Sequence, residues 1–341
     1  MLSRVANSVY WIGRYLERAE NIARFIDVNL QMSLDAPITF SEQWQPVVTI
    51  TGDLGPFMER YKVADRQNVI RFLASDPDNP NSILSCITKA RQNARSVREI
   101  ISSEIWEQVI RFYLLVSNRS AAQRALSFSH EFFSDVKLMS QTVAGVADHT
   151  MSHGQPWHFL QLGRLLERAD NTTRLLDVKY FLLLPSPDQV GGPVDEMEWS
   201  MLLRSATAFE MYRKRYGRIS PDRVIEFLLL DKEFPRAVLF CLQAAEDSLH
   251  AITGSPRGAY SNPAEQRLGR LGAELAYTHV YDIIASGLHE FLDGFQGKLN
   301  DLDDALSSTF FSLQPLSQDG RGQIGDVLSG HQGQRWPGSD S

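Results

Sequence analysis

Hydrophobic residues recur three and four positions apart along most of this chain, which is the spacing of one face of an α-helix. No stretch of alternating hydrophobic and polar residues is long enough to predict a sheet. The pattern therefore predicts an all-α protein. The first helix is expected over residues 2–32, with apolar positions at Val5, Val9, Ile12, Leu16, Ala19, Ala23 and Ile26. Further helices are expected over Phe57–Phe72, Ile83–Val116, Ala121–Met151, Trp157–Leu183, Glu198–Tyr216, Pro221–Leu230, Pro235–Ile252 and Gln266–Phe311.

Proline, glycine and aspartate punctuate this pattern. Ser220, Pro221 and Asp222 have the order of a helix start, in which a hydroxyl caps the first turn and proline occupies its first position. We therefore expect the Ser220 side chain to cap the helix that follows. Breaks between helices are expected at Asp35–Pro46, Gly52–Pro56, Asp76–Pro80, Gly154–Pro156, Pro185–Pro193 and Gly254–Pro263.

The C-terminal segment 316–341 has a different composition from the rest. It contains six glycines and few aliphatic residues. Such a segment cannot bury enough apolar surface to offset the entropy of ordering its backbone. We expect a disordered C-terminal tail.

One segment of the chain occurs twice. Residues 11–30, WIGRYLERAENIARFIDVNL, match residues 161–180, QLGRLLERADNTTRLLDVKY, at an offset of 150. Residues 65–91 match 220–246 at an offset of 155, which pairs Pro80 with Pro235 and Cys86 with Cys241. At an offset of 159, His130-Glu131-Phe132 pairs with His289-Glu290-Phe291.

The conserved order of these matches predicts two copies of one helical-bundle unit, residues 1–156 and 157–315, followed by the tail at 316–341. We expect the copies to pack about a pseudo-two-fold axis, because the same apolar surface recurs on each. Cys86 and Cys241 are the only cysteines. They are expected to be small buried hydrophobic residues. A redox pair is less favoured, because neither lies in a Cys-x-x-Cys motif.

The repeated helix keeps its polar side in both copies while its apolar side varies. One interpretation is a buried, charge-balanced network that locks helix to helix, since arginine forks suit carboxylates. The other is a stripe that binds a carboxylate, a phosphate or a peptide backbone. The residues concerned are Arg14, Glu17, Arg18, Asn21 and Arg24 in the first copy and Arg164, Glu167, Arg168, Asn171 and Arg174 in the second.

Two glycines lie inside these helices at equivalent positions, Gly13 and Gly163. Glycine inside a helix is destabilising by about 1 kcal/mol relative to alanine. Its presence in both copies indicates that another helix or a ligand comes close to the backbone there.

Composition limits the possible functions. The 341 residues include 34 lysines and arginines and 41 aspartates and glutamates, so the formal net charge is -7. An acidic chain does not favour nucleic-acid binding, which needs a basic surface. No apolar run approaches the ~20 residues of a membrane-spanning helix. The N-terminal residues lack the uninterrupted apolar core of a signal peptide, so we expect a cytoplasmic protein without a membrane partner.

Histidines offer little evidence for a metal site. His149 and His153 are four residues apart and could share a helix face, but Ser308 and Ser312 stand at the equivalent positions. A solvated or capping role is favoured over zinc binding. The helix with the Glu-Arg pair lacks the Glu-x-x-His pattern of di-iron bundles. We expect no metal and no cofactor.

Two other groups have a structural and a functional interpretation. His130-Glu131 and His289-Glu290 could form acid–base pairs, but a hydrogen bond between packed helices is favoured. Arg213-Lys214-Arg215, with Arg218, could bind an anion near a helix start, but a solvated face is favoured.

The sequences around Tyr15–Asn21 and Leu165–Asn171, each with a Leu-Glu-Arg-Ala core, resemble the alpha-E family. This is a bacterial, all-helical domain family named for its Glu-Arg motif, which corresponds here to Glu17-Arg18 and Glu167-Arg168. The resemblance extends over most of the chain. It implies a gene context beside, or fusion to, circularly permuted ATP-grasp proteins, often near a transglutaminase-like protein. The implied role is in ATP-dependent amide ligation that makes or modifies a peptide.

Three functions follow as hypotheses. The preferred one is an all-helical partner of an ATP-grasp amide ligase that holds the ligase, or a peptide or amino-acid substrate. The second is an enzyme in its own right, in which Glu17 or Glu167 acts as general base and arginines clamp a carboxylate. The third is a purely structural interaction module. In the first and third cases any ligase chemistry resides in a partner.

Overall fold

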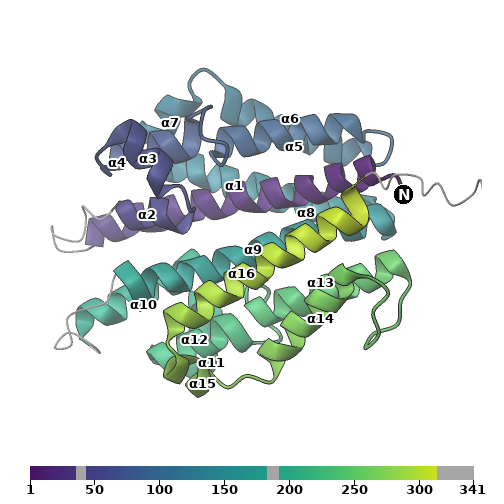
Figure 1. The fold of residues 1–341 in the computed structure, drawn as a ribbon. Coiled ribbons are helices and arrows are strands. Elements are labelled where there is room, and N and C mark those ends of the chain that lie inside the picture. Colours follow the sequence, from purple (N-terminus) through teal and green to yellow (C-terminus); the bar gives the residue numbers. More distant parts are fainter. Residues whose placement is uncertain (36–43, 183–191, 313–341) are drawn as a thin grey trace, which may run out of the picture. The chain divides into compact units, whose positions relative to one another are not determined.

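A computed structural model describes residues 1–35, 44–182 and 192–312. Within these ranges all regular secondary structure is helical, which confirms the predicted all-α class (Figure 1). The first eight helices are α1 (Ser3–Asp35), α2 (Gln45–Ile50), α3 (Leu54–Tyr61), α4 (Arg66–Ile70), α5 (Ile83–Ser96), α6 (Ser103–Ser117), α7 (Ala121–Ser127) and α8 (Ser129–Thr150). The next eight are α9 (Gln155–Leu182), α10 (Pro193–Ser205), α11 (Phe209–Tyr216), α12 (Pro221–Leu230), α13 (Val238–Thr253), α14 (Pro263–Ala276), α15 (Val280–Ser286) and α16 (Leu288–Leu306). Two π-helical turns, Arg71–Ser75 and Ser307–Phe311, follow α4 and α16.

The predicted long helices are correct at α1 and α9, whereas several others are broken into shorter ones. The predicted helix 83–116 is interrupted because the Ser102 side chain caps α6, accepting from Ile105 N at 3.2 Å. The predicted helix 57–72 ends early at Lys62, whose φ of 62° is left-handed. In the predicted helix 266–311, Gly287 with a φ of 91° separates α15 from α16. Hydrophobic spacing continues across each of these breaks and conceals them.

The start of α12 differs from the prediction in one respect. Ser220 is the residue before the helix and Pro221 is its first residue, as predicted. However, the Ser220 side chain makes no capping hydrogen bond, so this detail of the prediction is wrong. The backbone N–H of Ser220 instead donates to the hydroxyl of the buried Tyr212 at 3.1 Å. The entry to α12 is therefore fixed from α11 rather than by its own cap.

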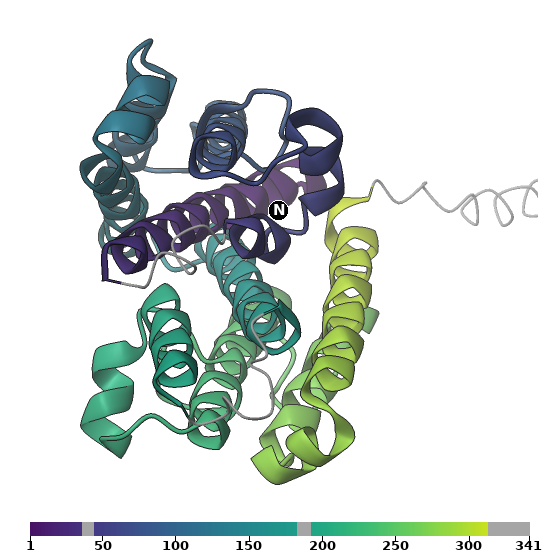
Figure 2. The ribbon, with the colours of Figure 1, turned by 90° about the vertical axis from the view of Figure 1, so that its left-hand side faces the viewer.

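Helices α1 and α9 pack against each other in the middle of the unit formed by residues 1–311. In both views α5 and α6 lie on the α1 side, and α12 to α14 lie on the α9 side (Figure 1, Figure 2). Helix α1 also packs against α5 and α8, while α9 packs against α13 and α16. These are the helices that the sequence matches pair with one another. The duplication, its axis and the boundary after residue 156 stay predictions, and the tail at 316–341 lies outside the described residues.

Two glycines set the distance between α1 and α9. A Cβ atom added to Gly13 would lie 2.3 Å from the carbonyl oxygen of Leu160, and one added to Gly163 would lie 2.2 Å from that of Tyr10. Both distances are too short for any side chain. The prediction that another helix approaches these glycines is confirmed, and each helix supplies the glycine that the other requires.

No helix in the described part of the chain is long and apolar enough to cross a membrane.

Candidate functional site

The Glu-Arg dipeptides of α1 and α9 pair with each other. Glu167 accepts from Arg18 Nε at 2.7 Å and from Arg18 Nη2 at 2.9 Å. In return, Glu17 accepts from Arg168 Nε at 2.9 Å and from Arg168 Nη2 at 2.8 Å. Each glutamate thus receives both nitrogens of an arginine fork from the opposite helix, the geometry in which such pairs are strongest.

Around Glu167, further groups complete what we call the Glu167 cluster: Tyr10, Arg14, Arg18, Glu167 and Asp303. Arg14 Nε donates to Glu167 at 2.6 Å, and Arg14 Nη1 donates to both oxygens of Asp303 at 2.8 Å. The Tyr10 hydroxyl donates to Asp303 at 2.7 Å. Two arginines face two carboxylates, so the pairing is balanced.

A neighbouring loop attaches to the Glu167 cluster. Arg18 Nη1 donates to the Asn81 side chain at 2.7 Å, and Asn81 Nδ2 donates to Asp53 at 2.9 Å. This adds a carboxylate and no cation, so the surroundings of Glu167 contain no excess of positive charge.

Around Glu17 the composition is different. We define the Glu17 cluster as Glu17, Glu20, Arg24, Arg164, Arg168 and Arg236. Arg236 donates to Glu17 at 3.0 Å and to Glu20 at 2.7 Å, and Arg24 also donates to Glu20. Arg164 Nε lies 4.0 Å from Glu17, a longer contact than its counterpart Arg14 makes with Glu167. Four arginines share two carboxylates in this cluster.

Both glutamates are buried among arginines that favour their ionised form. Glu17 is 1% exposed and Glu167 is 2% exposed. Burial alone would raise the pKa of Glu167, but the charges of Arg18 and Arg14 outweigh it and lower the pKa to about 2. For Glu17, Arg168 and Arg236 likewise outweigh burial and hold the pKa well below its ordinary value. Carboxylates held in this state are poor proton acceptors near neutral pH.

The pKa values of the counterparts Arg14 and Arg164 shift in opposite directions. Burial would lower the pKa of Arg14, but nearby acidic groups, among them Glu167 and Asp303, raise it above its ordinary value. In contrast, burial and the charge of Arg168 lower the pKa of Arg164. Arg164 is therefore a partly buried cation with less compensation than its counterpart.

The structure brings most, but not all, of the site residues predicted from the sequence into contact across α1 and α9. Most of them form the two clusters, and the Asn21 side chain accepts from Arg236 at 2.8 Å. Asn171 instead donates to the backbone oxygen of Glu167 in its own helix at 2.8 Å. Arg174 pairs with Asp170 of its own helix at 2.8 Å. The predicted stripe is thus largely a network between helices, and its role in binding stays a prediction.

Sequence identity between the copies did not reveal Asp303 and Arg236. The alignments place Ala144 opposite Asp303, and Asn81 opposite Arg236. Because these residues differ between the halves, a search for repeated residues passes over them. The signal lay in those two differences: the Glu17 side lacks the negative charge of Asp303 and gains the positive charge of Arg236.

A groove of about 640 Å³ opens beside the Glu17 cluster, between α8, α9 and α13. Arg164 and Arg168 line it, so this part of the network is accessible from a cavity. The side chains of Arg164 and Arg168 are 19% and 12% exposed. The lining also includes the apolar or aromatic residues Ala144, Trp157, Leu165 and Phe240 and the acidic residues Asp148 and Asp247.

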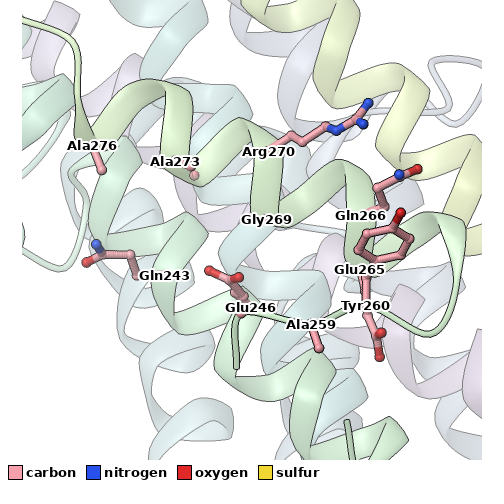
Figure 3. Close-up of a pocket in the computed structure, with 12 residues that line it drawn as sticks. Gln243, Glu246, Ala259, Tyr260, Glu265, Gln266, Gly269, Arg270, Ala273 and Ala276 are labelled. Carbon is pink, nitrogen blue, oxygen red and sulfur yellow. The ribbon is translucent and has the colours of Figure 1, made fainter. Parts of the chain in front are cut away.

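A second cleft, of about 420 Å³, lies between α13 and α14 and contains none of the predicted site residues. Figure 3 shows Glu246 pointing from α13 toward Gly269, while the Arg270 side chain points away from it. A Cβ atom added to Gly269 would lie 3.2 Å from the Glu246 carboxylate. The absence of a side chain at Gly269 therefore gives this carboxylate its space.

The repeated histidines join packed helices, as predicted. Hydrogen bonds connect His130 Nδ1 to Asp27 at 2.8 Å and His289 Nδ1 to Asp177 at 2.6 Å. These contacts tie α8 to α1 and α16 to α9.

The remaining candidates have structural surroundings. Cys86 and Cys241 are buried and free, and burial raises the pKa of both thiols to about 12. His153 stacks on Trp157 with ring centroids 4.1 Å apart. Among the described residues, no three histidine, cysteine or acidic side chains are grouped as metal ligands. The basic residues Arg213, Lys214, Arg215 and Arg218 are exposed, as a solvated face predicts.

Comparisons with known proteins identify a family that has an ER motif. The model of the Alpha-E family, a predicted alpha-helical domain with a conserved ER motif, matches residues 1–311. Uncharacterized proteins of Mycobacterium bovis and Mycobacterium tuberculosis are 25% identical to the chain over 345 residues. These matches cover 92% of the chain but only 38% of each relative's length. No solved structure matches the chain.

Proposed function

The chain belongs to the Alpha-E family, and from this premise we propose that it is a non-catalytic helical partner of a circularly permuted ATP-grasp amide ligase. In this role it holds a peptide or amino-acid substrate for ligation, and a transglutaminase-like protein is a further partner. The ligation chemistry resides in the ATP-grasp protein. The proposal takes its partners from the family resemblance and its non-catalytic character from the geometry of the Glu-Arg helices.

The observation that supports the non-catalytic role is the pairing of Glu17 and Glu167 with arginines. Each accepts hydrogen bonds from arginine forks of the opposite helix, and each has a lowered pKa. A general base needs access to a substrate proton and a pKa near the working pH. These glutamates have neither property, which disfavours the enzyme hypothesis. Their pairing supports a motif that fixes two helices and the surfaces they carry.

The length of the curated relatives supports a multi-part system. The chain matches 38% of each relative, so most of each relative's length lies outside the match. That length leaves room for additional domains in the same polypeptide. A separate chain would then need to associate with its partner through its surface.

Co-expression with the circularly permuted ATP-grasp protein encoded beside such a chain tests the proposal. We expect the two proteins to co-elute in size-exclusion chromatography, and amide formation from ATP to require both. Replacing the exposed Tyr277 by serine serves as a control for surface changes that leave the fold intact. A chain that stays monomeric beside an active ligase, or that forms amides alone, would contradict the proposal.

A purely structural module is the second candidate, and the balanced Glu167 cluster favours it. In that cluster Arg14 and Arg18 form ion pairs with carboxylates of the same chain. Ligase activity that is unchanged by adding the chain would support this candidate over a substrate-binding role.

A further inference from the structure

We propose that the groove between α8, α9 and α13 binds the free carboxylate of an amino acid or short peptide, with Arg164 as its principal partner. This inference deepens the proposed function and rests on it for the ligand's role as a ligase substrate. The binding itself is a property of the chain alone.

The first argument comes from a carboxylate, Asp303, that the Glu167 cluster contains and the Glu17 cluster lacks. In the Glu167 cluster, Arg14 donates to Asp303 of α16 at 2.8 Å. The matched sequences place Arg164 opposite Arg14 and Ala144 opposite Asp303. Arg164 and Ala144 both line the groove. The groove therefore lies where an internal carboxylate neutralises the equivalent arginine in the other half.

The second argument is charge. Four arginines of the Glu17 cluster face Glu17 and Glu20, an excess of two positive charges. Arg164 makes one hydrogen bond, to Gln161 at 3.1 Å, and one long contact with Glu17, among the described residues. Arg24 is 7% exposed, and its Nε has no hydrogen-bond partner in the described structure. Charges taken out of water require compensation, and an anion in the groove supplies it.

The third argument is the shape and lining of the groove. Its volume of about 640 Å³ is in the range of small-ligand sites. Trp157 and Phe240 provide apolar walls, and Trp157 Nε1 and His158 Nδ1 are buried without hydrogen-bond partners in the described structure. A site with one anchoring cation pair and aromatic walls suits a ligand with one carboxylate and an apolar side group.

Acidic groups restrict the class of anion. Asp148 and Asp247 also line the groove, and their side chains are 54% and 48% exposed. Asp247 pairs with Arg257 and Asp148 lies 3.8 Å from His153, and both carboxylates still disfavour ligands with several negative charges, such as nucleotides. They tolerate a monocarboxylate and favour one that also carries an ammonium group, as amino acids and peptides do. The combination of Arg164 with these acids points to the carboxylate terminus of such a ligand.

Isothermal titration calorimetry of the purified full chain tests this site, with L-alanyl-L-phenylalanine and its C-terminal amide as probes. We expect the acid to bind about tenfold or more tightly than the amide, because a charge-assisted hydrogen bond is lost. Arg164→Gln should weaken binding of the acid by a similar factor. Binding of free phenylalanine as tight as the dipeptide would support an amino-acid ligand, and tighter dipeptide binding would support a peptide.

Ala144→Asp provides the sharpest variant. It introduces a carboxylate at the position equivalent to Asp303 and should occupy Arg164 from within the chain. We expect it to weaken dipeptide binding about tenfold or more and to raise the Tm by about 2 °C. Leu138→Asp adds the same charge to α8 at an exposed position outside the groove lining, and should leave binding unchanged.

Several outcomes would overturn the inference. These are equal affinity for acid and amide, undiminished binding by Arg164→Gln, or displacement of the dipeptide by equimolar inorganic phosphate. If Ala144→Asp fails to fold, the acid–amide comparison and Arg164→Gln still decide. If the chain forms a complex with the ligase but does not bind the dipeptide, only this inference is contradicted. If the chain binds the dipeptide but forms no complex with the ligase, only the proposed function is contradicted.

Discussion

The Glu167 cluster and the Glu17 cluster are built from matching stretches of α1 and α9, but their charges are unequal. In the first, Asp303 and Glu167 balance Arg14 and Arg18. In the second, Ala144 stands opposite Asp303 in the alignment, and Arg236 stands opposite Asn81. The reciprocal Glu-Arg pairs are common to both clusters and connect the two helices. The neighbouring elements then decide whether a cluster is self-contained or has charge left for a ligand.

This contrast separates two tasks that the repeated helix could not reveal by itself. Joining the helices needs Glu17, Glu167 and their arginine partners, and these residues are identical in both copies. Binding a ligand needs an arginine with an unmet charge beside a cavity, and Arg164 meets both conditions. Variants at equivalent positions of the two clusters test this difference.

Neutralising the glutamates should have the largest effect. Glu17→Gln leaves the four arginines of the Glu17 cluster with Glu20 alone, so we expect the free energy of unfolding to fall by about 3–5 kcal/mol, as when other buried ion pairs are broken. Glu167→Gln should cost less, about 3 kcal/mol, because Asp303 still compensates Arg14. Urea denaturation followed by circular dichroism measures both.

The exposed Glu274, paired with Lys298, is the matched control for these variants. Glu274→Gln should change stability by less than about 1 kcal/mol. A larger loss for Glu167→Gln than for Glu17→Gln would contradict the unequal charge of the two clusters. Lost dipeptide binding by a variant with unchanged stability would instead favour a binding stripe over a network.

Replacing Gly13 or Gly163 should cause the next largest loss of stability, and the loss should be equal in the two helices. An alanine Cβ at either position would lie within 2.3 Å of a backbone oxygen of the other helix. We expect Gly13→Ala and Gly163→Ala each to destabilise the fold by about 3 kcal/mol, near the upper end for overpacking. Thermal melting of both variants measures the loss.

Gly294 in α16 is the control, because an added Cβ there meets nothing within 4 Å. Gly294→Ala should be neutral or stabilising by up to about 1 kcal/mol. Strongly unequal losses at Gly13 and Gly163 would show that the two helices are not equivalent at their contact.

Removing Asp303 should leave the Glu167 cluster with an excess of positive charge, as in the Glu17 cluster. Asp303→Ala takes one carboxylate from Arg14, and we expect a loss of about 1–2 kcal/mol. Added acetate should restore part of the Tm, since the arginine would then have room for an external carboxylate. Asp304→Ala, at the exposed neighbouring residue, should show neither effect. Destabilisation without recovery in acetate would indicate that the cluster collapses instead of opening.

The sequence predicted the elements better than the charges between them. The spacing of apolar residues identified α1 and α9, and Gly13 with Gly163 indicated their close approach. It could not show that the polar side of α1 faces α9 and not water, because amphipathic spacing alone does not say what covers the polar side. Asp303 and Arg236 reach the network from distant helices and loops, so their contacts depend on the complete fold.

The smallest effect is expected at the histidines that tie the outer helices to α1 and α9. The hydrogen bond that His289 donates to Asp177 raises the pKa of His289 above its ordinary value of 6.5. A raised pKa in the folded state stabilises the protein below the unfolded pKa, and this stabilisation is lost as the pH rises through the folded pKa. His289→Gln should therefore cost well under about 1 kcal/mol at about pH 5 and less at about pH 9, where the imidazole is neutral and only its uncharged hydrogen bond to Asp177 is lost. His130→Gln should cost less still, because Lys137 lies 2.6 Å from Asp27 and continues to neutralise it. Urea denaturation at both pH values measures these losses, and a loss for His289→Gln that grows toward high pH would contradict the assigned sign.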